Sequence, residues 1–166
     1  MNSLNPLIAA SFGLSALAIA PALQEHPLLI INETASMTKG LYAYTDKANT
    51  LKRGDIVALK MALGANAYLV DELGYPETTL LIKRVAGTSG DIMCRHGTTV
   101  TINAKTVHAS GKDRLGNSLP YWDGCAVLQP NQVFLLGDHP NSFDSRYFGP
   151  VTNSELLGIY RGVMTW

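Results

Sequence analysis

The sequence Leu80-Leu81-Ile82-Lys83-Arg84-Val85-Ala86-Gly87 combines aliphatic residues with two adjacent basic ones. Branched and aliphatic residues that end at a glycine are typical of a β-strand, and we expect a strand over residues 79–85. Side chains alternate between the faces of a strand, so Leu81, Lys83 and Val85 share one face, and Ile82 and Arg84 share the other. One of the two basic side chains is therefore expected to point toward the apolar side of the sheet.

Short apolar runs of the same kind, separated by Gly, Pro, Asn and Asp, continue along the chain from residue 54. Residues 99–102 and 106–108 flank Asn103-Ala104-Lys105 and predict a tight hairpin. Further strands are expected at 56–59, 132–136 and 156–164, one helical stretch at 65–73, and an extended surface loop at 111–124. The predicted fold class is mainly β: an antiparallel β domain with an N-terminal apolar helix and little other helix.

The length and composition restrict the class of protein. The chain has 166 residues, of which 46% are hydrophobic, so it can build a core and is not a disordered protein. Its 13 basic and 13 acidic residues give a formal net charge of zero. Phosphate contacts need a basic surface, so a nucleic-acid partner is not expected.

The N-terminal part is unusually apolar. Residues 7–23 are nearly all apolar, and the first charged residue is Glu25. A membrane-spanning helix needs about 20 apolar residues, with about 17 as the lower limit. We expect residues 1–24 to be a membrane anchor or a secretory signal, which places the β-rich domain at 25–166 outside the cytoplasm. A buried hydrophobic helix of a soluble domain is the alternative.

The two cysteines leave two interpretations open. Cys94 and Cys125 can form one disulfide if the compartment is oxidising. Alternatively, they are two buried thiols that behave as small hydrophobic residues. No CxxC motif or histidine cluster accompanies them, so no metal site is predicted, and nothing in the sequence indicates a cofactor.

A serine and a lysine are the candidates for chemistry. The motifs GxGxxG, GxxxxGK[ST], HExxH and GxSxG are absent from the sequence, and a Ser-His-Asp triad built from distant positions stays open. Burial lowers the pKa of a lysine, and a neutral amine can take the proton of a serine hydroxyl and make it a nucleophile. Lys83 could act in this way on Ser36, although a strand lysine ordinarily extends its charge into water.

Several motifs occur in an order that resembles the conserved boxes of type I signal peptidases. They are Ser36-Met37, Gly54-Asp55-Ile56-Val57, Ile82-Lys83-Arg84-Val85-Ala86-Gly87, Gly90-Asp91 and the unbroken run GDHPNSFDSRYFGPV at 137–151. The segment SMTKGLY at 36–42 is similar to the signature of the conjugative-transfer branch, the TraF-type peptidases. Thr38 stands where that branch usually has proline. The resemblance covers the chain from about residue 32 to its end.

The resemblance implies roles for particular residues. Ser36 matches the nucleophile and Lys83 the general base of a Ser/Lys dyad. The Thr34 hydroxyl and the Ser36 backbone N–H match the oxyanion hole, and Ser142 matches the serine that orients the lysine. Asp144 and Arg146 match a structural charge pair near the site. The alternatives are an ordinary strand residue for Thr34, a turn cap for Ser142, and solvated surface charges for the pair.

The function expected from this resemblance is that of a membrane-associated serine endopeptidase that cleaves exported precursors. Its substrate would be a pilin-like precursor in conjugative transfer, with either hydrolysis or cyclisation as the outcome. It would lie in the inner membrane, with residues 25–166 forming a serine peptidase domain that faces the periplasm. The alternatives are a general type I signal peptidase, a self-cleaving repressor-type protein, and a non-catalytic periplasmic assembly factor.

Overall fold

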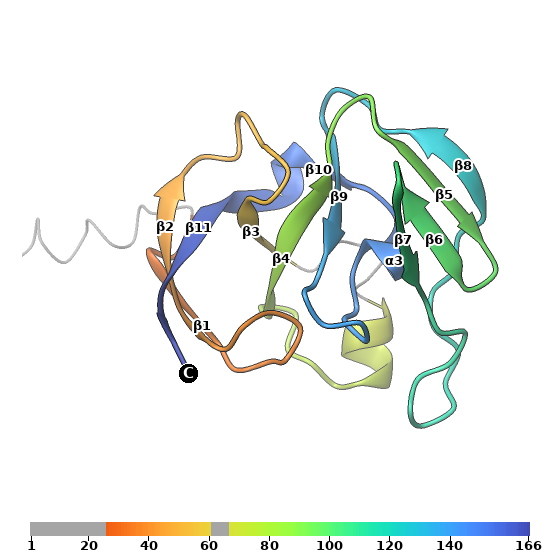
Figure 1. Cartoon of the computed structure of the whole chain (residues 1–166). Helices are drawn as coiled ribbons and strands as arrows, with labels where there is room; N and C mark the ends of the chain where they lie inside the picture. Colours follow the sequence, from red (N-terminus) through yellow and green to blue (C-terminus); the bar gives the residue numbers. More distant parts are fainter. Residues whose placement is uncertain (1–25, 61–66) are drawn as a thin grey trace, which may run out of the picture.

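The computed structural model describes residues 26–60 and 67–166, most of which belong to strands or to the turns between them (Figure 1). The predicted anchor or signal at residues 1–24 lies outside the described residues. Within the described part, no helix has the length and apolar character needed to cross a membrane. The strands are β1 (Leu29–Asn32), β2 (Gly40–Asp46), β3 (Ile56–Lys60), β4 (Leu80–Gly87), β5 (Ile92–His96), β6 (Thr99–Ile102), β7 (Lys105–His108), β8 (Gly124–Val127), β9 (Gln132–Leu136), β10 (Val151–Thr152) and β11 (Leu156–Thr165).

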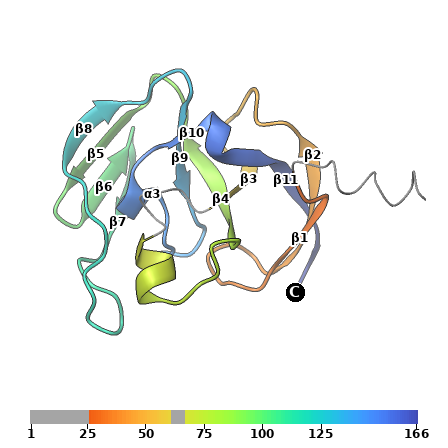
Figure 2. The same cartoon turned by 180° about the vertical axis from the view of Figure 1, so that it is seen from behind.

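The strands form two antiparallel sheets. The larger sheet has seven strands in the order β1-β2-β11-β3-β4-β9-β10, and the smaller has four in the order β7-β6-β5-β8. Figures 1 and 2 show the two sheets beside each other, with the short helix α3 (Ser145–Phe148) near the smaller one. The prediction of a mainly antiparallel β domain is confirmed.

The predicted elements agree with the structure where the apolar pattern is strong. The strands expected at 56–59, 79–85, 99–102, 106–108, 132–136 and 156–164 match β3, β4, β6, β7, β9 and β11 to within two residues. The helical stretch is a π-helix at Ala67–Glu72, and its predicted start at 65–66 lies outside the described residues. The predicted loop at 111–124 contains one isolated bridge, Lys112 to Ser118, and Gly124 already begins β8.

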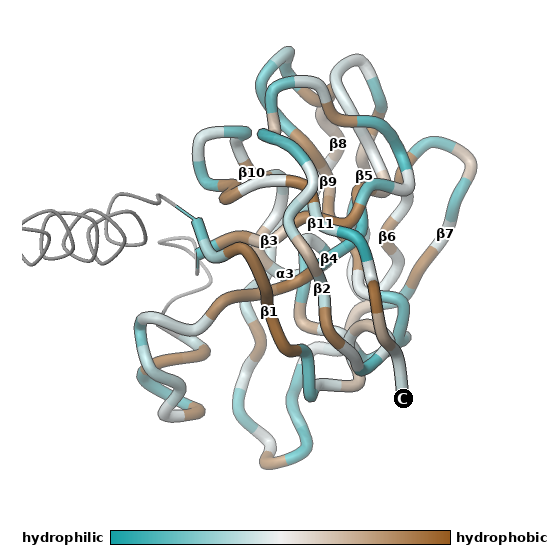
Figure 3. Tube along the Cα trace, turned by 90° about the vertical axis from the view of Figure 1, so that its left-hand side faces the viewer, coloured by the Kyte–Doolittle hydropathy of each residue, from teal (hydrophilic) through white to brown (hydrophobic). Residues whose placement is uncertain are grey.

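Strands β1, β2, β5, β8 and β10 were not predicted, because they are short or lack a clear apolar alternation. Strand β1 is an edge strand whose Leu29 and Ile31 are 56% and 66% exposed. Figure 3 shows the hydrophobic character of this edge. An apolar strand with exposed side chains does not have the half-buried pattern by which strands are usually predicted.

Strand β9 connects two hydrophobic cores. Its Phe134 and Leu136 pack into a cluster with residues of the smaller sheet, and its Val133 and Leu135 pack into a second cluster with β3 and β4. Alternation along one strand therefore explains why its sequence is apolar throughout. Gly87 at the end of β4 lets the sheets approach, since a Cβ there would lie 2.6 Å from Ile102 Cδ1.

The two cysteines lie opposite each other on β5 and β8 and form a disulfide. Cys94 is half-buried and Cys125 is exposed. Of the two interpretations, the structure therefore has the disulfide and not the pair of buried thiols.

Candidate active site

Ser36 lies in the seven-residue loop that joins β1 to β2 and is half-buried. The loop closes where Asn32 pairs with Gly40 in the ladder of these two strands. The following residue, Met37, is 2% exposed and packs into a core cluster with Tyr42 and Ile82. The loop is therefore fixed immediately after Ser36, while residues 33–35 stay exposed.

Lys83 points from β4 into the protein and reaches this loop. Its side chain is 2% exposed, and its Nζ donates hydrogen bonds to Ser36 Oγ at 3.2 Å and to the Ile82 carbonyl at 3.1 Å. The neighbouring Arg84 points the other way and pairs with Asp138 through two contacts of 2.8 Å. The two basic residues thus point in opposite directions, as the alternation predicts, and the lysine is the buried one.

Burial lowers the pKa of Lys83 from its ordinary value of 10.5 to about 8. The negative charge of Asp144 opposes this decrease, and the positive charge of Arg146 adds to it. No carboxylate forms a salt bridge with Lys83 in the described residues. Roughly a tenth of this amine is therefore neutral one pH unit below that pKa, and the neutral form is the one that a general base needs.

Thr34 is exposed and lies beside Ser36. Its Oγ1 is 2.9 Å from Ser36 Oγ and donates to Asn32 Oδ1 at 2.8 Å. The structure therefore brings Thr34, Ser36 and Lys83 together in one row of hydrogen bonds. Sequence analysis missed Asn32, because its contacts form only when the loop folds over its amide.

Ser142 is buried close to Ser36 but does not make the expected bond to the lysine. In the described structure its Oγ has no hydrogen-bond partner. It packs against Gly137, where an added Cβ would lie 2.1 Å from Ser142 Oγ and 2.7 Å from the Ser36 carbonyl oxygen. The serine hydroxyl is directed at this backbone, while the lysine amine uses Ser36 and its own strand as acceptors.

Asp144 and Arg146 form a buried pair, not solvated surface charges. Arg146 Nη2 and Nε donate to the two carboxylate oxygens at 2.7 and 2.8 Å. Arg146 also donates to the carbonyls of His108, His139, Pro140 and Ser142. Asp144 accepts from the Gly137 N–H at 2.8 Å. The pair therefore holds the 137–142 loop in place, and this loop in turn donates from the His139 N–H to the Ser36 carbonyl at 3.2 Å.

A cavity of about 550 Å³ opens over the serine and the lysine. Its lining is mostly apolar, with Glu33 as the one acidic residue: Ile30, Ile31, Asn32, Glu33, Thr34, Ser36, Leu69, Leu73, Tyr75, Thr79, Leu80, Leu81, Ile82, Lys83 and Phe143. Such a lining suits a ligand with apolar groups.

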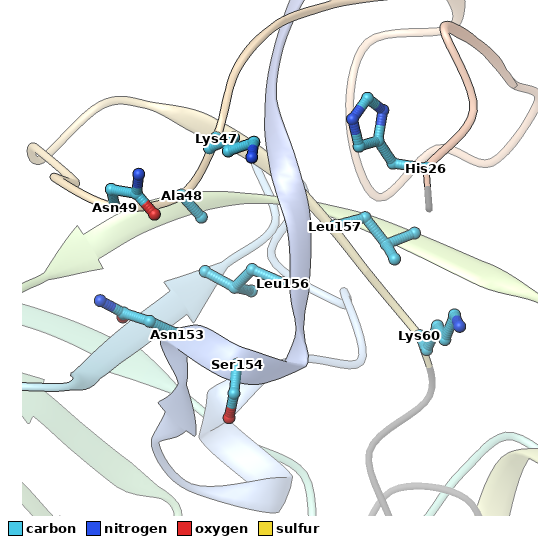
Figure 4. Close-up of a pocket in the computed structure, with 9 residues that line it drawn as sticks. All are labelled: His26, Lys47, Ala48, Asn49, Lys60, Asn153, Ser154, Leu156 and Leu157. Carbon is cyan, nitrogen blue, oxygen red and sulfur yellow. The ribbon is translucent and has the colours of Figure 1, made fainter. Parts of the chain in front are cut away.

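A second cavity, of about 730 Å³, lies between His26, Lys47 and Leu157 (Figure 4). It also contains a serine and lysines, but Ser154, Lys47 and Lys60 are all exposed. The Ser154 hydroxyl lies 2.9 Å from that of Thr152, and among the described residues it shares no hydrogen bond with a lysine. The smaller cavity is therefore the candidate active site. Among residues 26–60 and 67–166, no group of three or more His, Cys, Asp or Glu side chains could hold a metal ion.

Comparison with known proteins shows which proteins the chain resembles. The sequence model of the family described as "Signal peptidase, peptidase S26" matches residues 3–166. The chain is 34% identical over 148 residues to a conjugal transfer protein TraF of Agrobacterium tumefaciens (strain 15955), and the match covers 82% of each chain. It is 26% identical over 151 residues to signal peptidase I V of Bacillus subtilis (strain 168), a match that covers 84% of this chain and 76% of the relative. A crystal structure of a signal peptidase I from Enterococcus faecalis V583 shares 21% identity over 67% of this chain and 97% of its own, with a TM-score of 0.39.

Proposed function

The chain belongs to the signal peptidase family, peptidase S26, and from this premise we propose that it is a serine endopeptidase in which Ser36 is the nucleophile and Lys83 the general base. One observation carries the proposal: an amine that is 2% exposed lies 3.2 Å from a serine hydroxyl. This is the distance over which a base and a nucleophile exchange a proton. The pKa of about 8 makes that exchange feasible at physiological pH.

The reaction follows from this geometry. Neutral Lys83 takes the Ser36 proton while Oγ attacks the carbonyl carbon of the scissile bond. The Ser36 N–H and the Thr34 hydroxyl, turned away from Asn32, donate to the oxyanion, and the loss of one such donor typically costs about 2.7–4 kcal/mol. The Lys83 ammonium then returns its proton to the leaving amine. An acyl-enzyme results, which water hydrolyses or which an amine of the substrate attacks to give a cyclic product.

For the substrate, we propose a pilin-like precursor of a conjugative system. The support is the 34% identity to a relative described as a conjugal transfer protein and the segment SMTKGLY at 36–42. The apolar lining of the cavity fits the small and apolar residues expected beside the scissile bond.

For the location, we propose the inner membrane with the described domain in the periplasm. The apolar residues 7–23 support a membrane anchor. The disulfide between Cys94 and Cys125 supports an oxidising compartment. Exposed apolar side chains on β1 and β11, the two strands that flank β2 (Leu29, Ile31, Val163 and Met164), support contact with lipid.

A general type I signal peptidase is the second candidate, and the match to signal peptidase I V favours it. Incubating the full chain in detergent with a conjugative pilin precursor and with a general secretory precursor separates the two. Cleavage of the pilin precursor alone supports the specialised function, whereas equal cleavage of both supports the general one.

The dyad itself is tested by replacing Ser36→Ala, with Ser154→Ala from the second cavity as the matched control. We expect cleavage to be lost only in the first variant, while circular dichroism shows that both remain folded. If Ser36→Ala keeps cleaving, the proposed nucleophile is wrong. If the wild-type chain cleaves no precursor and acquires no acyl group on Ser36, the non-catalytic assembly factor is favoured.

A further inference from the structure

Asn32, the last residue of β1, holds the loop that carries Ser36 from inside the protein. Its side chain is 7% exposed. Nδ2 faces three carbonyl oxygens, those of Thr34 at 3.0 Å and of Met37 and Thr38 at 3.1 Å. Oδ1 accepts from the Thr34 N–H at 3.2 Å and from the Thr34 hydroxyl at 2.8 Å. One amide therefore binds the main chain on both sides of the nucleophile.

In the described part of the chain, no other side chain forms hydrogen bonds to the main chain both before and after Ser36. Tyr42 reaches only the Thr38 carbonyl, and the His139 N–H reaches only the carbonyl of Ser36 itself. Because residues 33–35 are exposed, the segment before Ser36 has little else to fix its position.

The amide also sets the direction of the hydrogen bonds in the site. The three carbonyls identify Nδ2 as the donor end of the amide, so the atom facing Thr34 is an oxygen, which only accepts. The Thr34 proton is therefore directed at Asn32. While Lys83 is protonated, the Ser36 hydroxyl donates to Thr34, and when Lys83 is neutral the Ser36 proton turns to the amine. With a protonated lysine, the row runs from Lys83 to Ser36, to Thr34 and to Asn32.

We propose that Asn32 is a positioning residue that holds Ser36 Oγ at proton-transfer distance from Lys83 and keeps the Thr34 hydroxyl beside it. This inference rests on the proposed function of the same site. Asn32-Glu33-Thr34 also matches a glycosylation motif, but a buried Nδ2 with three acceptors is not available for modification.

The test measures acetylation of Ser36 by p-nitrophenyl acetate across pH 6 to 10, with the acetyl group located by mass spectrometry. Asn32→Leu removes both ends of the amide, and Asn32→Asp keeps the acceptor and removes the donors. Asn103→Asp is the matched control, because the Asn103 side chain also accepts from a main-chain N–H, that of Ile92, but lies in the turn between β6 and β7 of the other sheet.

We expect the plateau rate of Asn32→Leu to fall about 10²-fold, the typical cost of a displacement of about 1 Å in a reacting group. The midpoint of its pH profile stays near that of the wild type, because Lys83 remains buried. Asn32→Asp also reacts slowly, and its midpoint rises because the added negative charge favours the ammonium. Asn103→Asp reacts like the wild type.

Different failures have different meanings. If the wild-type Ser36 is not acetylated, the proposed function fails, and this inference fails with it. If the wild type reacts and Asn32→Leu reacts equally fast, only the role of Asn32 is wrong. A midpoint in Asn32→Leu that moves to the value of an exposed lysine, or loss of folded protein in both variants, assigns Asn32 to the fold and also overturns the proposal.

Discussion

Lys83 and Arg146 are both basic residues that are 2% exposed, yet their surroundings are opposite. Arg146 donates to both oxygens of Asp144 and to four backbone carbonyls. Lys83 has one serine hydroxyl and one carbonyl as acceptors. The pKa of Arg146 is raised because the carboxylate outweighs burial, while the pKa of Lys83 is lowered because burial outweighs the distant charge of Asp144.

Burial alone therefore does not identify a catalytic group. A buried guanidinium must be paired, because it does not lose its proton in a protein. A buried amine without a counter-ion can become neutral, and beside an alcohol it becomes a base. We assign the structural role to the paired cation and the chemical role to the unpaired one.

The strongest test of this contrast is Lys83→Arg, which places a guanidinium at the position of the buried amine. We expect the rate of Ser36 acylation to fall about 10³-fold, because general-base catalysis is worth about 10²- to 10⁴-fold and a guanidinium cannot supply it. Lys83→Ala should be equally slow. Substantial activity in Lys83→Arg would show that positive charge is what the site requires.

The reverse change, Asp144→Asn, removes the partner of Arg146. A buried charge left without its partner typically costs about 3–5 kcal/mol in the free energy of unfolding, which urea denaturation measures. The same variant loses the negative charge that raises the pKa of Lys83, so the midpoint of its pH–rate profile should fall below that of the wild type. A midpoint that rises instead would contradict the assigned direction of this coupling.

Lys83→Met tests how much the burial of this amine lowers the free energy of unfolding. The folded-state pKa of about 8 lies below the ordinary 10.5, so folding is penalised while the ammonium must be buried. The penalty, about 3 kcal/mol, is full below pH 8 and disappears as the pH rises to 10.5. We expect Lys83→Met to be inactive but more stable than the wild type at pH 7, with the difference vanishing near pH 10.5. Equal stability at pH 7 would mean that Lys83 is not desolvated.

Arg84→Ala should have the smallest effect. Arg84 and Asp138 form an ion pair in which the side chains are 40% and 39% exposed, and exposed pairs contribute about 0–1 kcal/mol. We expect a small decrease in the melting temperature and an acylation rate close to that of the wild type. A large loss of activity would show that Arg84, although exposed, contributes to the reaction, which the contrast between Lys83 and Arg146 does not explain.

The sequence predicts the strand that carries Lys83 but not the burial of its amine. Alternation places Lys83 and Arg84 on opposite faces, and the choice between them depends on the 33–39 and 137–142 loops, which pack from distant parts of the chain. The order of the boxes supplied Ser36 and Lys83 through a resemblance, not through any local pattern.

Three other features depend on contacts that local sequence does not specify. The pairing of Cys94 with Cys125 follows from the register of β5 and β8, two strands that were not predicted. The predicted bond from Ser142 to Lys83 is absent because the Ser142 hydroxyl packs against Gly137. Asn32 becomes visible only when the loop folds over its amide.

The central claim is that one amine in this protein is desolvated enough for its pKa to approach neutral pH. Nuclear magnetic resonance of the chain labelled with ¹³C-lysine follows the Cε chemical shift of each lysine with pH, and Lys83→Arg assigns the resonance by its disappearance. We expect Lys83 to titrate at about 8. Titration of Lys83 near 10.5, the ordinary value of a lysine, would contradict the claim.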